Sequence, residues 1–143
     1  MREFMKIVES AGAHMIEVSD DDYDMEGYVC DADAEQVDNW LSYRHHINDQ
    51  TIVDMIHTRF KRVAFLNNLN VEEHARGKGH GNSLLEDFLS EATDYGADAC
   101  LLIADVNEEQ NEGFDLVKWY EGYGFKIIHH GTGSGPLMMV ETN

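Results

Sequence analysis

The clearest pattern of apolar and polar positions lies in the second half of the chain. Val63 to Val71 is a mostly apolar run that predicts a strand, and Leu84 to Ala92 repeats apolar residues at helical spacing with acidic residues opposite. Gly96 follows that helix as a C-terminal cap. Cys100 to Val106 is a continuous apolar run, typical of a strand buried on both faces. We therefore expect a strand, a helix and a second strand in succession.

The C-terminal segment predicts one more helix and a hairpin. Apolar positions from Phe114 to Tyr120 favour a helix that stops at Gly122. Lys126 to His129 and Leu137 to Glu141 read as two strands joined by the glycine-rich turn at 131–136. Strands and helices that alternate in this way predict a mixed α/β (α+β) fold.

The first sixty residues give a weaker pattern. His14 to Ser19 and Gly27 to Cys30 fit two strands separated by an acidic turn. Asp33, followed by Gln36, resembles a capping box and predicts a helix that runs to about Tyr43. From Ile52 to Phe60 apolar residues recur at helical spacing, which favours a helix, although alternation over the same residues also fits a strand.

The composition adds a strong negative charge. The chain has 143 residues, which corresponds to one domain, and a formal net charge of -18. Ten Asp and Glu residues lie between Glu17 and Asp38 with no Lys, Arg or His among them, so residues 1–62 form an acidic N-terminal half beside a core at 63–140. Such a run is a solvated face, or a surface that attracts a cationic molecule or partner. Direct DNA or RNA binding needs clustered Lys and Arg and is disfavoured.

Several classes of protein are excluded at this stage. The chain contains no stretch of eighteen apolar residues and its first residues lack the apolar region of a signal peptide, so we expect a cytoplasmic protein with no membrane segment. Cys30 and Cys100 are too few for a disulfide framework. The eight histidines include the adjacent pairs at 45–46 and 129–130, whose side chains diverge, so we expect no metal site.

The most informative segment is the glycine-rich turn at 71–81, between the predicted strand and helix. Its glycines are Gly77, Gly79 and Gly81, and its basic side chains are His74, Arg76, Lys78 and His80. Backbone N–H groups and a helix N-terminus at such a turn favour an anion, so a ligand that carries phosphate is expected. The spacing fits neither a dinucleotide fingerprint, since Asn82 replaces the third glycine, nor a P-loop, since Gly79 follows Lys78.

Two motifs resemble the GNAT superfamily of acyl-CoA N-acyltransferases. Arg76-x-x-Gly79-x-Gly81 is similar to its pyrophosphate-binding motif, and the segment 119–125, Trp-Tyr-Glu-Gly-Tyr-Gly-Phe, is similar to the end of its last helix. The resemblance spans residues 63–140. It implies a mixed, mostly antiparallel sheet that is splayed at its central strands and flanked by helices. It also implies acetyl-CoA as cosubstrate, attacked directly by an amine in a ternary complex.

The resemblance also implies roles for individual residues. Tyr120 corresponds to the tyrosine that assists the departing CoA thiolate. The residues implied to bind the cofactor are Leu69, Val71, Arg76, Gly77, Lys78, Gly79, His80, Gly81 and Asn111. Asn111, or alternatively Asn107, is a substitute for an asparagine whose position in the family is occupied by Gly113 here.

The general base is the point where this chain departs from the family. Some relatives have a catalytic glutamate on the central strand, at the position of Phe65. We predict Glu72, just after that strand, as the catalytic carboxylate. Alternative proton acceptors are Glu73, Asp105 and His129.

These features predict an N-acetyltransferase whose acceptor is a primary amine of a cationic small molecule or protein. A non-catalytic acidic module, binding a basic partner or mimicking nucleic acid, is the alternative. A toxin that acts on charged tRNA is a third reading, against which the acidic composition argues. The family often forms dimers, so a homodimer is an open option.

Overall fold

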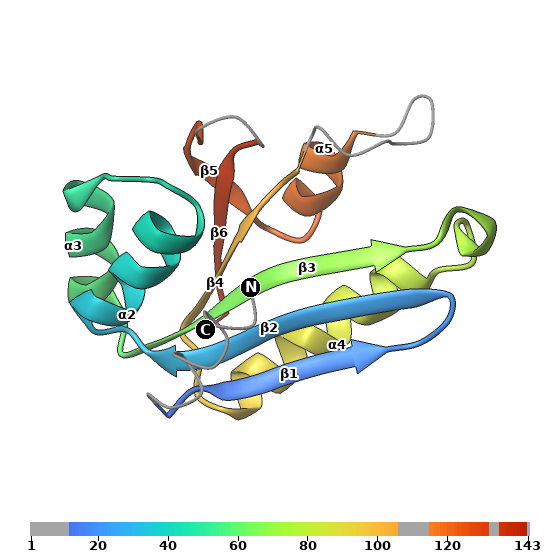
Figure 1. The fold of residues 1–143 in the computed structure, drawn as a ribbon, viewed down its shortest axis with the longest axis horizontal. Helices are drawn as coiled ribbons and strands as arrows, with labels where there is room; N and C mark the ends of the chain where they lie inside the picture. Colours follow the sequence, from blue (N-terminus) through green and yellow to red (C-terminus); the bar gives the residue numbers. More distant parts are fainter. Residues whose placement is uncertain (1–11, 106–114, 132–134, 143) are drawn as a thin grey trace.

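Six strands form one mixed sheet in the computed structural model, which describes residues 12–105, 115–131 and 135–142 (Figure 1). The strand order is β1-β2-β3-β4-β6-β5, and β3 and β4 are the parallel pair in an otherwise antiparallel sheet. The strands are β1 His14–Ser19, β2 Tyr23–Asp31, β3 Arg62–Val71, β4 Ala99–Ile103, β5 Lys126–His129 and β6 Leu137–Glu141. The predicted mixed, mostly antiparallel sheet is therefore confirmed.

The first two strands form a longer hairpin than the sequence pattern predicts. β1 has the predicted bounds. β2 spans Tyr23–Asp31, so the predicted strand Gly27–Cys30 covers only part of it. The acidic residues Asp24 and Glu26 belong to β2 because each is paired on both sides, with β1 and with β3. Non-local pairing thus extends a strand through residues that have low strand propensity.

The helix predicted from Asp33 to Tyr43 is present in two parts. Asp33 caps α2 (Ala34–Asp38), since its carboxylate accepts a hydrogen bond from the Gln36 backbone N–H at 2.8 Å. The chain continues without a break as the π-helical turn η1 (Asn39–Arg44). The wider turn matters because it carries the buried Trp40 and Leu41 into the core and ends at Arg44.

The ambiguous segment at 52–60 is a helix, α3 (Gln50–Arg59), as the helical spacing indicated. Asp49 caps it by accepting from the Ile52 N–H at 3.3 Å. Ile52, Val53 and Ile56 are buried on one face, which rules out the alternating pattern of a strand.

The long helix α4 (His80–Asp94) includes the predicted Leu84–Ala92 and begins four residues earlier, inside the glycine-rich turn. It ends in a Schellman arrangement, with Gly96 N–H bonded to Thr93 O and Ala97 N–H to Ala92 O. β4 ends at Ile103, earlier than the predicted Val106, which lies outside the described residues.

The C-terminal elements agree with the sequence pattern. α5 (Leu116–Glu121) is capped by Asp115, whose carboxylate accepts from the Lys118 N–H at 3.1 Å, and ends at Gly122. β5 and β6 pair antiparallel, as expected for a hairpin. Phe114 and positions 132–134 of the connecting turn lie outside the described residues.

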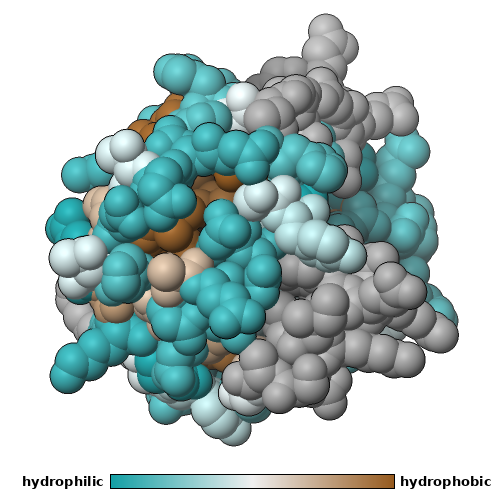
Figure 2. All heavy atoms as spheres, turned by 60° about the vertical axis from the view of Figure 1, so that its left-hand side comes forward, coloured by the Kyte–Doolittle hydropathy of each residue, from teal (hydrophilic) through white to brown (hydrophobic). Residues whose placement is uncertain are grey.

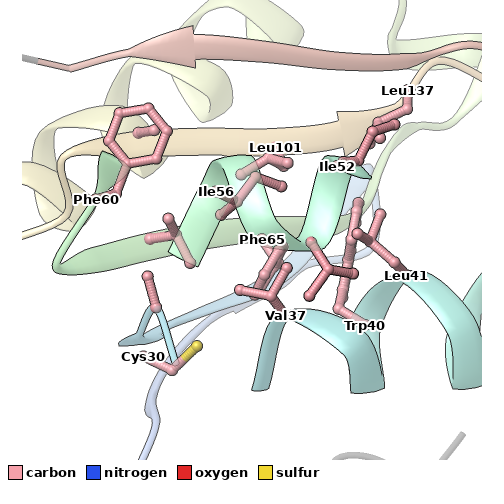
Figure 3. Packing of buried hydrophobic residues seen from close by; sticks show 14 of the residues in the cluster. Cys30, Val37, Trp40, Leu41, Ile52, Ile56, Phe60, Phe65, Leu101 and Leu137 are labelled. Carbon is pink, nitrogen blue, oxygen red and sulfur yellow. The ribbon is translucent and has the colours of Figure 1, made fainter. Parts of the chain in front are cut away.

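Two apolar cores lie on opposite faces of the sheet. On one face α2, η1 and α3 cover Phe65 and Leu101, with Trp40 and Ile56 fully buried between them (Figure 3). The outer surface on that side is mostly hydrophilic, with smaller apolar areas between the polar side chains (Figure 2). The other face packs against α4 and α5. Helices thus cover both faces of the sheet, as the resemblance implied.

Candidate active site

The sheet opens between its two parallel central strands. β3 and β4 pair from Val63 with Ala99 as far as Leu66 with Leu102, whereas β3 continues along β2 to Val71. The two strands diverge beyond that point in a V shape (Figure 1). Within the described residues, the backbone edge of β3 from residue 68 to 71 therefore has no strand partner on the β4 side, and an extended amide-bearing ligand can pair with such an edge.

A cleft of about 510 Å³ occupies this opening. Its walls come from β3, from the glycine-rich turn, from the end of β4, from α5 and from the end of η1. Residues implied as cofactor ligands or catalytic residues line it at Leu69, Val71, Arg76, Gly77, Gly79, His80, Gly81 and Tyr120. Lys78 and Glu72 are exposed and lie outside this lining, and Asn111 lies outside the described residues.

The glycine-rich turn presents backbone donors to one end of the cleft. The first hydrogen bond of α4 runs from Ser83 N–H to Gly79 O, and no side chain caps the helix, so the N–H groups at 80–82 have no acceptor within the described chain. Gly77 and Gly79 have φ of 83° and 85°, a backbone conformation that side chains disfavour. This end of the cleft therefore has the geometry of an anion site.

Side chains hold the turn in place. Arg76 Nε donates to Val71 O at 3.0 Å, so the arginine that lines the cleft also anchors the end of β3. His74 Nε2 lies 2.8 Å from Asp22 Oδ1, and the Tyr23 ring lies 4.8 Å from the His80 ring. The acidic β1–β2 turn thus braces the basic residues of the glycine-rich turn.

Tyr120 enters the cleft from α5. Its side chain is 6% exposed, and its ring contacts Phe125 at 5.6 Å and Trp119 at 4.9 Å between centroids. Trp119 Nε1 in turn donates to Asn82 Oδ1 at 2.9 Å, which ties α5 to the first turn of α4. Tyr120 is therefore packed between two aromatic rings, one of which is bonded to the first turn of α4.

The predicted proton acceptors differ in whether they line the cleft. Glu72 accepts from Asn70 Nδ2 at 3.3 Å on the outer side of the strand end. His129 lies on β5, where its Nδ1 accepts from the Gly131 N–H at 2.8 Å, and it does not line the cleft. Asp105, at the end of β4, is the one carboxylate among the described lining residues.

Two lining residues that the sequence analysis did not identify come from the N-terminal half. Arg44 ends the π-helical turn η1 and His45 follows it, and both reach the cleft from the sheet face opposite α4 and α5. Arg44 Nη2 lies 3.4 Å from Asn67 O, and Trp40 Nε1 donates to Asn67 Oδ1 at 2.8 Å. One signal was present in the sequence, since Arg44 is the only Lys or Arg between residues 7 and 58.

Burial changes the ionisation of this pair. Burial, with the neighbouring Arg44 and His46 charges, lowers the pKa of His45 to about 4, so its imidazole is neutral near pH 7. Burial also lowers the pKa of Arg44, an effect that the nearby Glu26 carboxylate opposes. A guanidinium nevertheless stays protonated at neutral pH. The apex of the cleft, where β3 and β4 separate, therefore has a cation beside a neutral imidazole.

We expect His45→Gln to make the protein less sensitive to acid. The pKa of His45 is about 4 in the folded state and near 6.5 in the unfolded state, so on acidification below pH 6.5 the unfolded chain takes up a proton first. The wild-type protein should lose about 2 kcal/mol between pH 7 and pH 5 from this residue alone. Urea unfolding at both pH values should show a smaller loss for His45→Gln, whereas the exposed His57→Gln control should lose as much as wild type. Equal losses in all three proteins would contradict the assignment.

No group of three or more His, Cys, Asp or Glu side chains in ranges 12–105, 115–131 and 135–142 is placed to hold a metal ion. In the same ranges no helix is long and apolar enough to span a bilayer.

A six-stranded, mostly antiparallel sheet that opens between its two parallel central strands, with helices on both faces, defines a mixed α/β fold. No protein-family model and no curated protein matches the sequence. Solved structures do resemble it. The polyamine N-acetyltransferase of Drosophila melanogaster, which forms N-acetylagmatine, has a TM-score of 0.60 at 10% identity over 84% of this chain and 69% of that one.

Two further structures show the same likeness. Arylalkylamine N-acetyltransferase 2 from Aedes aegypti has a TM-score of 0.56 at 15% identity, over 99% of this chain and 78% of that one. The NatC complex bound to Gag peptide and CoA has a TM-score of 0.54 at 15% identity, over 83% of this chain and 60% of that one. The chain therefore has the GNAT fold, as the sequence resemblance predicted.

Proposed function

We propose that the protein is an N-acetyltransferase that transfers the acetyl group of acetyl-CoA to an amine. The observation that carries this proposal is that one cleft combines N–H groups at 80–82 and an edge of β3 that both lack backbone partners within the described part of the chain. The N–H groups suit a pyrophosphate, and the strand edge suits the amide-bearing pantetheine arm. The likeness to a structure that contains CoA supports this choice.

The two faces of the sheet give the two substrates separate entrances. The glycine-rich turn and Tyr120 lie on the α4 and α5 side, whereas Arg44 and His45 reach the same cleft from the η1 side. Acetyl-CoA entering from the first side would place its thioester near Leu66 and Leu102, where the strands separate. An amine entering from the other side would meet it there, which supports direct attack in a ternary complex.

The acceptor is a primary amine on a cationic small molecule or protein. The formal net charge of -18 supports attraction of such a cation. Similar structures belong to enzymes named for polyamine and arylalkylamine acceptors, and these two classes define the first acceptors to test. Peptides with free α-amino groups form a third class, since NatC was solved with a peptide.

We expect Arg76→Gln to weaken acetyl-CoA binding about tenfold, because a charge-assisted hydrogen bond to phosphate is worth roughly 1.5 kcal/mol or more. Calorimetric titration of acetyl-CoA measures the change. Arg59→Gln is the matched control, since Arg59 lies outside the cleft lining, is exposed and pairs with Glu141 at 2.9 Å. If both variants lose equal affinity, only the overall charge matters. If wild type binds no acetyl-CoA, the proposed function is wrong.

A second candidate is a non-catalytic acidic module that keeps the fold and binds a basic partner. The run of ten acidic residues between Glu17 and Asp38 favours it. A screen of polyamines, arylalkylamines and peptides with acetyl-CoA separates the two candidates, since the module would bind basic partners without releasing CoA. Turnover of any acceptor would support the enzyme.

A further inference from the structure

We propose that Arg44 lowers the pKa of the acceptor amine at the apex of the cleft, so that the amine reaches the thioester in its neutral, nucleophilic form. This inference rests on the acetyl transfer proposed above and assigns a role to a residue from the acidic half of the chain. Arg44 would take no direct part in the bond changes. Its positive charge would act on the protonation of the amine, so it is a positioning residue and not a catalytic one.

The position of Arg44 follows from the way the sheet opens. β3 stops pairing with β4 after Leu66, and its next residue, Asn67, lies at the register shift between β2 and β3. The Arg44 Nη2 atom lies 3.4 Å from the backbone oxygen of this same Asn67. The guanidinium is therefore anchored at the residue where the wedge begins, next to the expected thioester.

The charges around Arg44 come from every neighbouring element. On β2, Glu26 lies near the guanidinium and Tyr28 remains a neutral phenol, because burial raises its pKa well above the ordinary range. Asp24, further along β2, accepts a hydrogen bond from Asn68 Nδ2. His45 is neutral, His46 follows it in sequence, and Asp105 faces the cleft from the end of β4.

The acidic charges of the chain have two opposite effects on the reactivity of an incoming amine. The acidic surface attracts a cation but also stabilises its ammonium form. An amine with a pKa near 10.4 is neutral in only about one molecule in 2,500 at pH 7. No carboxylate lies on β3 between Val63 and Asn70, so at the point where the strands separate the Arg44 charge is the group that favours the neutral amine.

The bound ammonium first gives one proton to water, which the Arg44 charge favours. The neutral nitrogen then forms a bond to the acetyl carbonyl carbon, and the carbon–sulfur bond breaks with its electron pair on sulfur. The second nitrogen proton reaches the thiolate through water, with the Tyr120 hydroxyl as a hydrogen-bond donor to sulfur. The products are an N-acetyl amine and CoA thiol.

The test is the pH dependence of kcat with acetyl-CoA and saturating agmatine, whose single amine titrates while its guanidinium stays charged. The rising limb of kcat reports the pKa of the bound amine. We expect Arg44→Gln to shift this rising limb to higher pH by about one pH unit, which lowers kcat about tenfold at pH 7. Arg44→Lys, which keeps the charge, should leave the limb close to wild type. Glu26→Gln, which removes a negative charge, should shift the rising limb to lower pH.

The outcomes distinguish a failure of the role of Arg44 from a failure of the proposed acetyl transfer. A limb that stays in place in Arg44→Gln, with kcat reduced equally at every pH, would show a structural role and overturn the inference alone. If agmatine binds without turnover, proton release on its binding to the protein–CoA complex gives the same comparison, and an equal release from wild type and Arg44→Gln overturns the inference. Absence of acetyl-CoA binding would remove the proposed function and the inference with it.

Discussion

Tyr120→Phe is expected to lower kcat for acetyl transfer by about 100-fold while acetyl-CoA binding stays within a few-fold of wild type. The phenol has a pKa near 10 and a thiol one near 8.5, so full proton transfer to the thiolate is uphill by about 2 kcal/mol. The hydroxyl therefore stabilises the leaving sulfur mainly by a hydrogen bond. Such a bond forms only as the thiolate develops, so its loss affects kcat rather than binding.

The structure makes this variant a clean test. Phenylalanine keeps the ring contacts of Tyr120 with Phe125 and Trp119, so the fold should be retained. Release of CoA thiol measures the rate, and thermal unfolding checks the fold. Tyr95→Phe is the matched control, because Tyr95 is 49% exposed at the end of α4 and outside the cleft lining. Equal rates for Tyr120→Phe and Tyr95→Phe would exclude a catalytic role for the phenol.

Local signals in the sequence were sufficient for most elements. The helix at Leu84–Ala92 and the strand at Val63–Val71 each have an apolar pattern that extends over the whole segment. Both segments lie within elements of the predicted type, α4 and β3. The glycine-rich turn was also predictable, because closely spaced glycines between a strand and a helix indicate a backbone that can approach an anion. The walls of the cleft near the turn were predictable from these features.

The rest of the cleft depends on contacts that no local pattern records. Arg44 and His45 reach the apex because η1 continues α2 as a wider turn and because Trp40 is bound to Asn67 across the sheet. β2 extends to Tyr23 because two strands pair with it. Both outcomes depend on residues far away in sequence, so the pattern within a single segment does not predict them.

Close packing at the register shift between β2 and β3 explains why a glycine stands at 27. Gly27 pairs with Leu66 next to the shift, and a Cβ on it would point toward Phe88 of the long helix α4. A Cβ at this position would lie 2.5 Å from Phe65 O and 2.5 Å from the Phe88 ring. The close approach of backbone and helix at this point therefore requires a residue without a side chain.

We expect Gly27→Ala to destabilise the protein by on the order of 3 kcal/mol, at the upper end of the cost of overpacking, because one contact is with backbone that cannot rotate away. For a chain of this size the melting temperature should fall by roughly 10 °C. Urea and thermal unfolding measure both quantities. Gly81→Ala is the matched control, since its Cβ would lie 3.6 Å from Trp119, an ordinary contact, inside α4.

A second-site variant separates the two contacts at Gly27. Phe88→Leu removes the ring but leaves the Phe65 carbonyl, so Gly27→Ala should cost less in the Phe88→Leu background than in wild type, yet still destabilise it. The residual cost measures the backbone contact, which is the part that displaces β3 near Leu66 and Asn67 and so distorts the apex of the cleft. If Gly27→Ala is as stable as Gly81→Ala in either background, β2 and β3 do not approach as closely as this register requires.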